Sequence, residues 1–354
     1  MKKNIVNILK SIVFMIVFVF LFLNVSSVLS LSESSITHFY DYEEDSIDVV
    51  YVGSSNAFAH YNTILAYEEY GITSSLLSTN KQPFSAIEYL IKESERTQNP
   101  KVYVIDIAMI NRDMKDKEEF TEARIRSVTD AMKFSKNRYD AINYMTKYTP
   151  IEEDNRMSMY FSFIKYHSSW KDAYRKIKSP TTSEIFQGHL LNEATATATN
   201  PMTKQTWNFN LEGELREDNR EVLDNLLAYI DQENLNVLFV IPTKNYGEVD
   251  MQSMNAASNY LESRNKKVIN FNSYVDDIGI DYATDFYDAA HLNVQGSTKY
   301  TLYFGAYLKD NYNLEDHRNK KNSKSWDEAY ETYKAKYKEY TKENYEILLE
   351  SIKK

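Results

Sequence analysis

A serine in the first part of the chain has the setting of a nucleophile. Ser55 follows Gly53 at the end of a β-branched run, IDVVYV over residues 47–52, that is typical of a buried strand. At the carboxyl end of a parallel strand, a glycine lets the backbone turn tightly, and the next helix offers free N–H groups and a positive dipole. A serine there has its hydroxyl at the ligand edge and its amide available to an oxyanion. Because serine–glycine turns are common, the motif indicates a nucleophile only together with a base.

A candidate base lies in the segment DFYDAAHLNVQG, residues 285–296. Asp288 and His291 have the spacing Asp-x-x-His, so their side chains can meet across one turn. A carboxylate on one ring nitrogen holds the imidazole tautomer, and the other ring nitrogen can then accept a serine proton. The segment follows the last expected strand and precedes a closing helix at Ser297–Leu308. We therefore predict that Ser55, His291 and Asp288 form a catalytic triad.

Together the two motifs resemble those of the SGNH/GDSL hydrolase superfamily. In that family the nucleophile lies in a Gly-x-Ser motif after the first strand, and Asp-x-x-His lies near the end of the domain. Ser55 matches the nucleophile, Ser54 stands where the name-giving Asp would be, and Asp288 and His291 match the other triad members. GSSN followed by DFYDxxHLNxxG looks most like the teichoic-acid D-alanylation (DltD-like) proteins and related SGNH polysaccharide O-acyltransferases of Gram-positive bacteria. The resemblance covers roughly residues 46–310, and only the two motifs are specific.

Two blocks of that family are altered here. The second-block glycine should lie within STNKQP, residues 78–83, and the Gly-x-Asn-Asp block is replaced by AMINRD, residues 108–113. In the family both blocks supply oxyanion donors, each worth roughly 10²–10³ in rate. We expect the amide of Ser55 to be one oxyanion donor, and we expect Gly53 to form part of the same site. The side chains of Asn80 and Asn111 are candidates for further donors. Weak oxyanion stabilisation fits a narrow transferase better than a broad esterase.

The elements that must position these residues are strands that alternate with helices. Besides residues 47–52, β-branched runs that predict strands buried on both faces occur at Val102–Ile107, Val237–Ile241 and Val268–Phe271. Helical patterns precede them at Phe84–Lys92, Asn219–Gln232 and Ser253–Arg264. This alternation predicts an α/β fold with a three-layer, doubly wound parallel sheet. The resemblance implies the SGNH version, which is flavodoxin-like.

The N-terminus has the composition of a membrane anchor. Lysines within residues 1–10 precede an apolar run from Ile12 that extends to Leu31, which gives roughly the 20 residues needed to cross a bilayer as a helix. We expect an uncleaved single-pass anchor over residues 1–31, with a cytoplasmic N-terminus by the positive-inside rule and an extracellular catalytic domain. A cleaved signal peptide, for which Val28–Ser30 would be a poor cleavage site, and a buried helix are the alternatives.

The remaining chain divides into a catalytic domain at 32–310 and a C-terminal helical extension at 311–354. A helical, aromatic segment at 112–217, richest in aromatic residues near Tyr160–Trp170, interrupts the alternation of strands and helices. It either forms an insertion over the ligand edge or completes the core, and its 180–207 part has the composition of a polar loop.

Aromatic residues at helical spacing occur in the C-terminal extension, and such a stripe usually packs on the parent domain. A partner helix, a glycan or the membrane surface are the alternatives. The aromatic residues of the extension are Trp326, Tyr330, Tyr333, Tyr337 and Tyr340.

Composition excludes several classes of function. The net charge of −10 makes the chain a poor partner for nucleic acid, whose binding depends on Lys and Arg. The chain has no cysteine, so it has no disulfide, no thiolate zinc site and no cysteine nucleophile. The remaining histidines lack ligand spacing, so we expect no metal and no cofactor. We expect Asp106 to be a buried, hydrogen-bonded carboxylate and Asp285 to be a turn or cap residue. The histidines without ligand spacing are His60, His167, His189 and His317.

Three functions remain compatible with these features. The first is transfer of an acyl group such as acetyl or D-alanyl, through an acyl-Ser55 intermediate, to a cell-envelope polysaccharide or teichoic acid. The resemblance implies that a membrane-bound O-acyltransferase partner delivers the acyl group. The second is an extracellular carbohydrate esterase or deacetylase with the same triad and water as acceptor. The third, motivated by the altered oxyanion blocks, is a catalytically inactive anchored scaffold.

Overall fold

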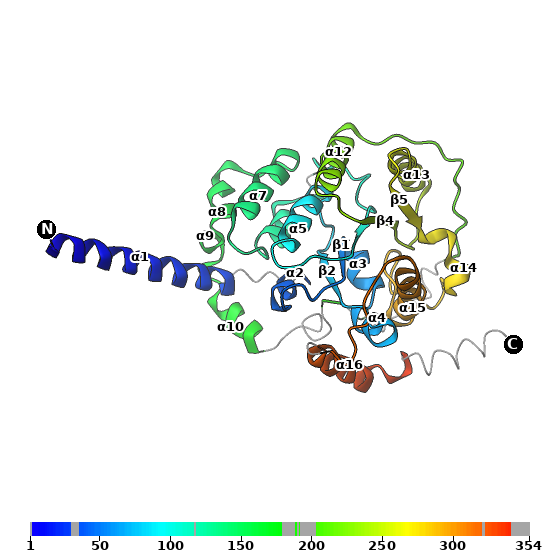
Figure 1. Ribbon diagram of the computed structural model, residues 1–354. Helices are drawn as coiled ribbons and strands as arrows, with labels where there is room; N and C mark the ends of the chain where they lie inside the picture. The colour runs from blue at the N-terminus through cyan, green and yellow to red at the C-terminus, as the bar shows by residue number, and fades with distance from the viewer. Residues whose placement is uncertain are drawn as a thin grey trace.

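The computed structural model describes residues 2–29, 35–116, 118–178, 188–189, 191, 203–320 and 323–340. Within these residues the chain is α/β, with a five-stranded sheet in the order β2-β1-β3-β4-β5 and every pair parallel (Figure 1). The strands are β1 (Val49–Gly53), β2 (Ser74–Ser78), β3 (Val102–Asp106), β4 (Val237–Ile241) and β5 (Lys267–Asn270). The four β-branched runs therefore lie in strands, with boundaries that differ by no more than a few residues.

Strand β1 shows why these runs are continuously apolar. Val50 and Val52 face one hydrophobic core, whereas Val49 and Tyr51 face a second core on the opposite side of the sheet. Successive side chains of a strand point to opposite faces, so a strand covered on both sides has no position left for a solvated polar residue.

Helices cover both faces of the sheet. The first core contains residues from α5 (Ile87–Ser94), α12 (Glu217–Gln232) and α13 (Glu248–Glu262). The second contains residues from α3 (Ser55–His60), α14 (Val275–Ile278) and α15 (Val294–Asn311). Further helices are α2 (Ser35–His38) and α4 (Thr63–Tyr70), and the 3₁₀ turns are η1 (Phe39–Asp41), η2 (Phe84–Ala86), η3 (Glu153–Asn155), η4 (Phe271–Ser273) and η5 (Lys338–Tyr340).

Strand β2 was not expected, because its sequence, SSLLS, lacks a β-branched run. Its serines are nevertheless buried. Ser35 at the start of α2 donates through its hydroxyl to the carbonyl of Ser78 at 2.9 Å and accepts from the Ser78 amide at 3.1 Å. The Ser74 hydroxyl reaches Tyr61 at 3.4 Å. Side chains from distant segments thus satisfy the polar groups of this edge strand, and that pairing cannot be read from the local sequence.

Helix α1 (Lys2–Leu29) projects from the domain (Figure 1). Asn4–Ser26 is long and apolar enough to cross a membrane, and none of its most hydropathic window is buried in the domain. The exposed apolar surface rules out the expected alternative of a buried core helix. Residues 30–34, which include the end of the anchor expected over 1–31, lie outside the described residues.

The described part of the segment 112–217 is largely helical up to Lys178, whereas its residues 203–216 form no helix. Its helices pack in two groups. Helices α6 (Glu122–Thr129) and α7 (Lys136–Tyr148) contribute Ile125, Ile142 and Met145 to the first core, so this part completes the core. Helix α8 (Arg156–Tyr160) also places Met159 in the first core, whereas α9 (Ser162–Tyr166) and α10 (Trp170–Lys178) contact the end of α1 (Figure 1). Most of the loop expected at 180–207 lies outside the described residues.

The C-terminal stripe packs on the parent domain, as predicted. In α16 (Lys324–Lys336), Trp326 and Tyr333 are buried. The Trp326 ring stacks on Tyr67 of α4 with centroids 5.3 Å apart, and the Tyr67 hydroxyl donates to Asp327 at 2.7 Å. Residues 341–354 of the expected extension lie outside the described residues.

Candidate active site

The end of β1 brings Ser55 to the carboxyl edge of the sheet. Gly53 is the last residue of the strand, Ser54 is the N-cap of α3, and Ser55 is the first residue of that helix. A Cβ atom on Gly53 would lie 2.5 Å from the Cβ of Asp106 on the neighbouring strand β3. Glycine is therefore required at this position, because the two strands approach too closely for any side chain.

The segment that carries the Asp–His pair is fixed by a buried ion pair. The Lys299 ammonium of α15 donates to the Asp285 carboxylate at 2.7 Å, and both side chains are almost fully buried. Asp285 also accepts from the amide of Asp281 at 2.8 Å, while its carbonyl accepts from the amide of Asn293. Asp285 is thus more than the turn or cap residue that we expected. It ties residues 281–293 to α15.

The structure brings the three predicted triad residues together. The Ser55 Oγ lies 2.7 Å from Nε2 of His291, and Nδ1 of His291 lies 2.9 and 2.8 Å from the two oxygens of Asp288. Since a carboxylate can only accept, Nδ1–H donates to Asp288, and Nε2 of the neutral ring accepts from the Ser55 hydroxyl. The chain of hydrogen bonds is the one that a serine nucleophile and its base require.

Asp288 is held as a carboxylate although it is partly desolvated. Burial raises its pKa, but hydrogen bonds from the His291 ring and from the amides of Ala290 and His291 outweigh burial, so the pKa of Asp288 is lowered overall. Its side chain is 46% exposed, against 20% for His291. The acidic end of the triad is therefore open to solvent, while Ser55 is half-buried.

A layer of polar residues beneath the triad positions the Asp–His segment. The Asn56 amide donates to the carbonyl of Ala290 at 2.6 Å, and Nε2 of His60 lies 3.2 Å from the same oxygen. His60 is fully buried, and burial followed by the nearby His291 lowers its pKa well below the usual 6.5. His60 is thus a neutral donor. Asn56 follows the nucleophile in GSSN, but the motif alone does not reveal this contact.

Protein-family models and curated proteins were both searched. Neither search found a match.

Of the expected oxyanion donors, only the amide of Ser55 belongs to the triad itself. The amide of Ser55 is at the first position of α3, where the helix itself provides no acceptor. The Asn111 side-chain amide donates to Asp250 at 2.8 Å instead, and its Oδ1 is buried without a partner. Asn80 is exposed just after β2, and its carbonyl accepts from Arg124 at 3.2 Å. A role for Asn80 or Asn111 in catalysis stays a prediction.

Sequence reasoning missed a buried cation at the same edge. Lys244, shortly after β4, is only 8% exposed. Burial lowers the pKa of its ammonium, and the charge of Asp106 raises it only in part. Asp106 is buried and accepts from the Ser54 hydroxyl at 3.0 Å and the Ala108 amide at 2.7 Å, as expected of a hydrogen-bonded carboxylate. A lone lysine three residues beyond a strand is the only sequence signal for this pair.

The remaining histidines have structural contacts. Nε2 of His317 lies 3.0 Å from Asp48, so His317 has a carboxylate neighbour that its sequence spacing did not reveal. His189 is fully buried, with Nε2 3.3 Å from the hydroxyl of Ser297. Over the described part of the chain, no three His, Asp or Glu side chains gather closely enough to hold a metal ion.

Proposed function

We propose that the chain is a membrane-anchored, extracellular serine acyltransferase of the SGNH type. The observation that carries the proposal is the continuous hydrogen-bond chain from the Ser55 hydroxyl through His291 to Asp288. The strand order β2-β1-β3-β4-β5, with helices on both faces, supports a doubly wound domain of that type. In such a sheet, ligands bind where the strand order reverses, and β1, with β2 on one side and β3 on the other, lies at that point.

The first half-reaction loads Ser55. Its Oγ attacks the carbonyl carbon of an acyl donor while Nε2 of His291 takes the hydroxyl proton. The Ser55 amide stabilises the oxyanion of the tetrahedral intermediate. The bond to the donor's leaving oxygen then breaks, and His291 returns the proton to that oxygen. The products are acyl-Ser55 and the donor alcohol, with the imidazole neutral again.

The second half-reaction transfers the acyl group. An acceptor hydroxyl gives its proton to His291 as its oxygen attacks the ester carbonyl of acyl-Ser55, and the proton then returns to Ser55 Oγ as that bond breaks. Asp288 stabilises the transient imidazolium in both halves. For this chain we propose acetyl or D-alanyl as the acyl group and a cell-envelope polysaccharide or teichoic acid as the acceptor. A membrane-bound O-acyltransferase would be the donor partner.

An esterase or deacetylase is the second candidate. Water would replace the acceptor hydroxyl, with every proton transfer unchanged. The exposure of Asp288 favours this alternative, because the acidic end of the triad is open to solvent. The hydrogen-bonded triad argues against the third possibility, an inactive scaffold, because Ser55, His291 and Asp288 have the contacts that proton transfer requires.

Mass spectrometry of the full chain in detergent separates transferase from esterase. After mixing with an activated acetyl ester, a transferase should keep the acetyl group on Ser55. Adding a polyol or envelope glycan should speed the loss of acetyl from Ser55, and the acceptor should become acetylated. Ser55→Ala is the control for modification elsewhere. Rapid release of free acetate at a rate that the acceptor does not change would contradict the transferase and favour the esterase.

A further inference from the structure

The end of α1 is packed against the helices α9 and α10. The hydroxyls of Ser26 and Ser162 are 3.0 Å apart, and the rings of Phe22 and Phe163 have centroids 5.3 Å apart. The segment suited to cross a membrane ends at Ser26. If α1 spans the bilayer, α9 must lie at the level where the span ends, which is the boundary between acyl chains and headgroups.

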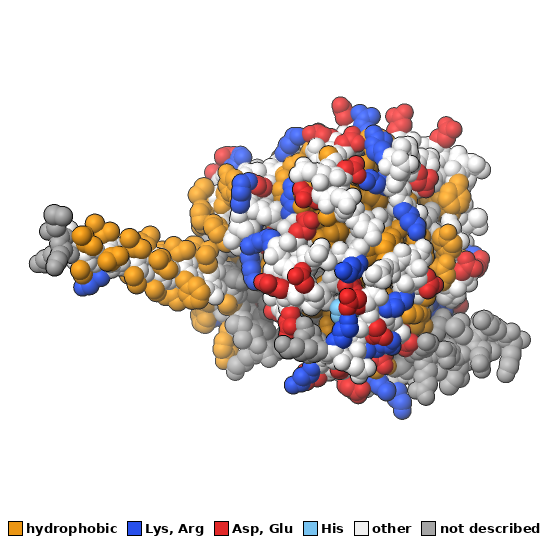
Figure 2. Space-filling view, viewed as in Figure 1, with side chains coloured by type: hydrophobic (Ala, Val, Ile, Leu, Met, Phe, Trp, Pro, Cys, Tyr) orange, Lys and Arg blue, Asp and Glu red, His pale blue; other side chains and the backbone are white. Residues whose placement is uncertain are grey.

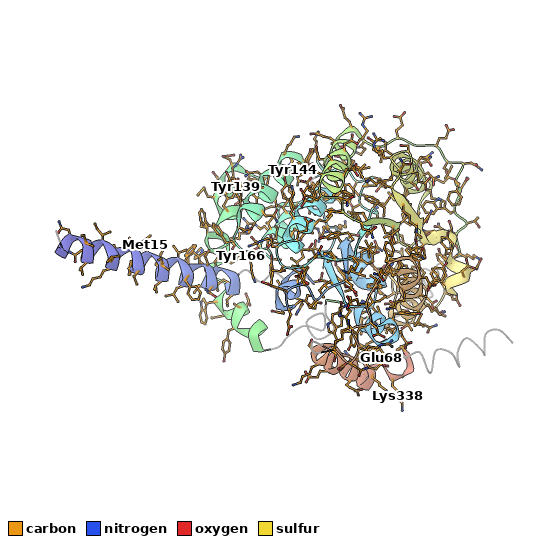
Figure 3. All side chains as sticks on the ribbon, in the orientation of Figure 1. Met15, Glu68, Tyr139, Tyr144, Tyr166 and Lys338 are labelled. Carbon is orange, nitrogen blue, oxygen red and sulfur yellow. The ribbon has the colours of Figure 1, made fainter. Side chains whose placement is uncertain are left out.

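The flank beside α1 carries most of the large exposed apolar side chains of the domain. They are Phe134, Tyr139, Met157, Phe161, Ile164, Trp170 and Tyr174. Outside α1 and this flank, the described residues expose only Phe209, Val249 and Tyr274 among large apolar side chains. Figure 2 shows apolar side chains continuing from α1 onto the adjoining part of the domain, and Figure 3 places Tyr139 and Tyr166 there.

The polar residues of this flank are also those of a membrane interface. Tyr and Trp rings join an apolar body to a polar tip, and they are enriched where headgroups meet acyl chains. Lys171 lies over the Trp170 ring at 5.4 Å, and Lys165 on α9 is half-exposed and paired with Glu122 at 3.5 Å. Long lysine side chains can lie along an apolar surface while their ammonium groups reach anionic headgroups.

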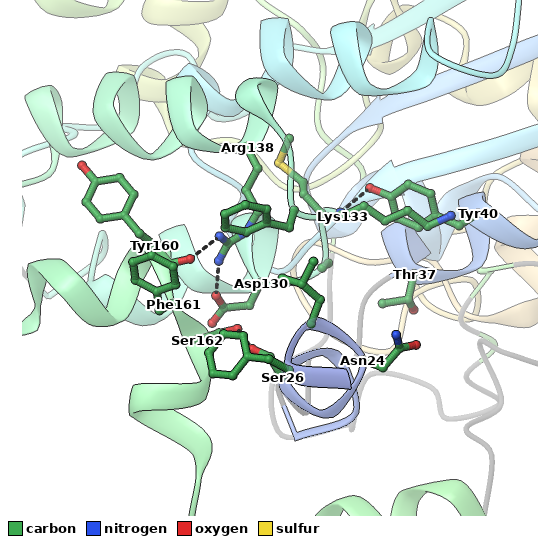
Figure 4. Close-up of a pocket in the computed structure, with 15 residues that line it drawn as sticks. Asn24, Ser26, Thr37, Tyr40, Asp130, Lys133, Arg138, Tyr160, Phe161 and Ser162 are labelled. Atoms are coloured by element: carbon green, nitrogen blue, oxygen red, sulfur yellow. Dashed lines mark hydrogen bonds and ion pairs between the residues drawn. The ribbon is translucent and has the colours of Figure 1, made fainter. Parts of the chain in front are cut away.

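A buried ion-pair network links the helices of this flank. Arg138 donates to Asp130 at 3.1 Å and to the carbonyl of Tyr160 at 2.8 Å, and Arg126 donates to the carbonyl of Ser158 at 3.1 Å. These bonds fix the backbone of α8 against α6 and α7. Asp130, Arg138 and Tyr160 also line a cavity of about 450 Å³ between the 130–134 turn, α7, α8 and the end of α1 (Figure 4).

We propose that this flank lies on the lipid surface, with Phe134, Phe161, Ile164, Trp170 and Tyr174 at the headgroup–acyl boundary. The catalytic domain is then held in one orientation on the bilayer rather than tethered freely. This orientation depends on α1 spanning the membrane and not on the reaction at Ser55. The exposed apolar surface of α1 continues onto α9 and α10 (Figure 2).

The three tryptophans of the chain permit a direct test. Trp170 is 61% exposed, whereas Trp207 and Trp326 are 7% and 4% exposed inside the domain. The full chain is inserted in phosphatidylcholine–phosphatidylglycerol vesicles, with and without lipid spin-labelled near the headgroup. We expect the labelled lipid to quench part of the tryptophan emission, and Trp170→Phe to abolish that part.

Trp207→Phe is the matched control and should leave the quenched part unchanged. Trp170 is on the surface, so its replacement should not affect folding, which near-ultraviolet circular dichroism would check. Quenching that is absent from the wild type, or as large in Trp170→Phe as in the wild type, would overturn the proposal. In either case the chemistry at Ser55 would be untouched, so failure here is distinguishable from failure of the proposed function.

Discussion

Lowering the pH from 7 to 5 should destabilise the fold through buried neutral histidines. His189 is fully buried, and burial lowers its pKa from 6.5 to about 3. In the unfolded chain the same imidazole takes up a proton as the pH falls through 6.5. Between those two values the unfolded state binds one more proton than the folded state. The free energy of unfolding therefore falls with falling pH by about 1.4 kcal/mol per pH unit.

Integrated from pH 7 to 5, that slope removes about 2 kcal/mol of stability for His189. Burial also lowers the pKa of His60, so His60 also destabilises the fold as the pH falls. Because one imidazole takes up at most one proton, its contribution is no larger than about that of His189. Carboxylates whose pKa burial raises, such as Asp106 and Asp285, oppose the effect. A comparison of variants is needed to isolate one histidine.

Urea unfolding of the full chain in detergent, at pH 7 and pH 5, measures this difference. The loss of stability between the two values should be about 2 kcal/mol smaller in His189→Gln than in the wild type. His167→Gln, which replaces an exposed histidine, is the control and should keep the wild-type loss. Equal losses in His189→Gln and the wild type would refute the conclusion that the buried ring stays neutral.

Two further substitutions test how the Asp–His segment is held. Asn56→Ala removes the hydrogen bond to the Ala290 carbonyl, so the rate at which Ser55 reacts with a fluorophosphonate should fall by up to about tenfold, while Asn143→Ala on α7, which removes hydrogen bonds to Tyr139 and Tyr160, should not change it. Lys299→Met leaves the buried Asp285 carboxylate unpaired and should reduce the free energy of unfolding by about 3–5 kcal/mol in a urea titration. Lys136→Met, which breaks an exposed pair, should change it by less than about 1 kcal/mol. A small effect of Lys299→Met would mean that the buried pair does not hold the segment.

The sequence was most informative where a pattern is local. β-branched runs located four strands, because burial on both faces demands a continuous apolar stretch. The Gly-x-Ser and Asp-x-x-His motifs are each local as well, and the parallel sheet then carries Ser55 and His291 to one edge. The spacing of the aromatic residues around Trp326 matches one face of a helix, so the sequence alone indicated that this face packs on the parent domain.

The remaining features depend on contacts between distant segments. Strand β2 is stabilised by Ser35, and Asp285 finds its partner in α15, so neither could be recognised from neighbouring residues. Lys244 is informative only once its burial beside Asp106 is known. The aromatic residues near Trp170 were evident in the sequence, but their position beside α1 follows only from the fold.

Site-specific labelling of Ser55 tests the central claim most directly. The full chain in detergent is treated with a fluorophosphonate, and the modified residue is found by mass spectrometry of its peptides. We predict modification at Ser55, slowed by at least about 100-fold in His291→Ala because the base is lost. Ser54→Ala, which removes the neighbouring hydroxyl, should still be labelled at Ser55. Labelling at an undiminished rate in His291→Ala, or no modification of Ser55 in the wild type, would contradict the account.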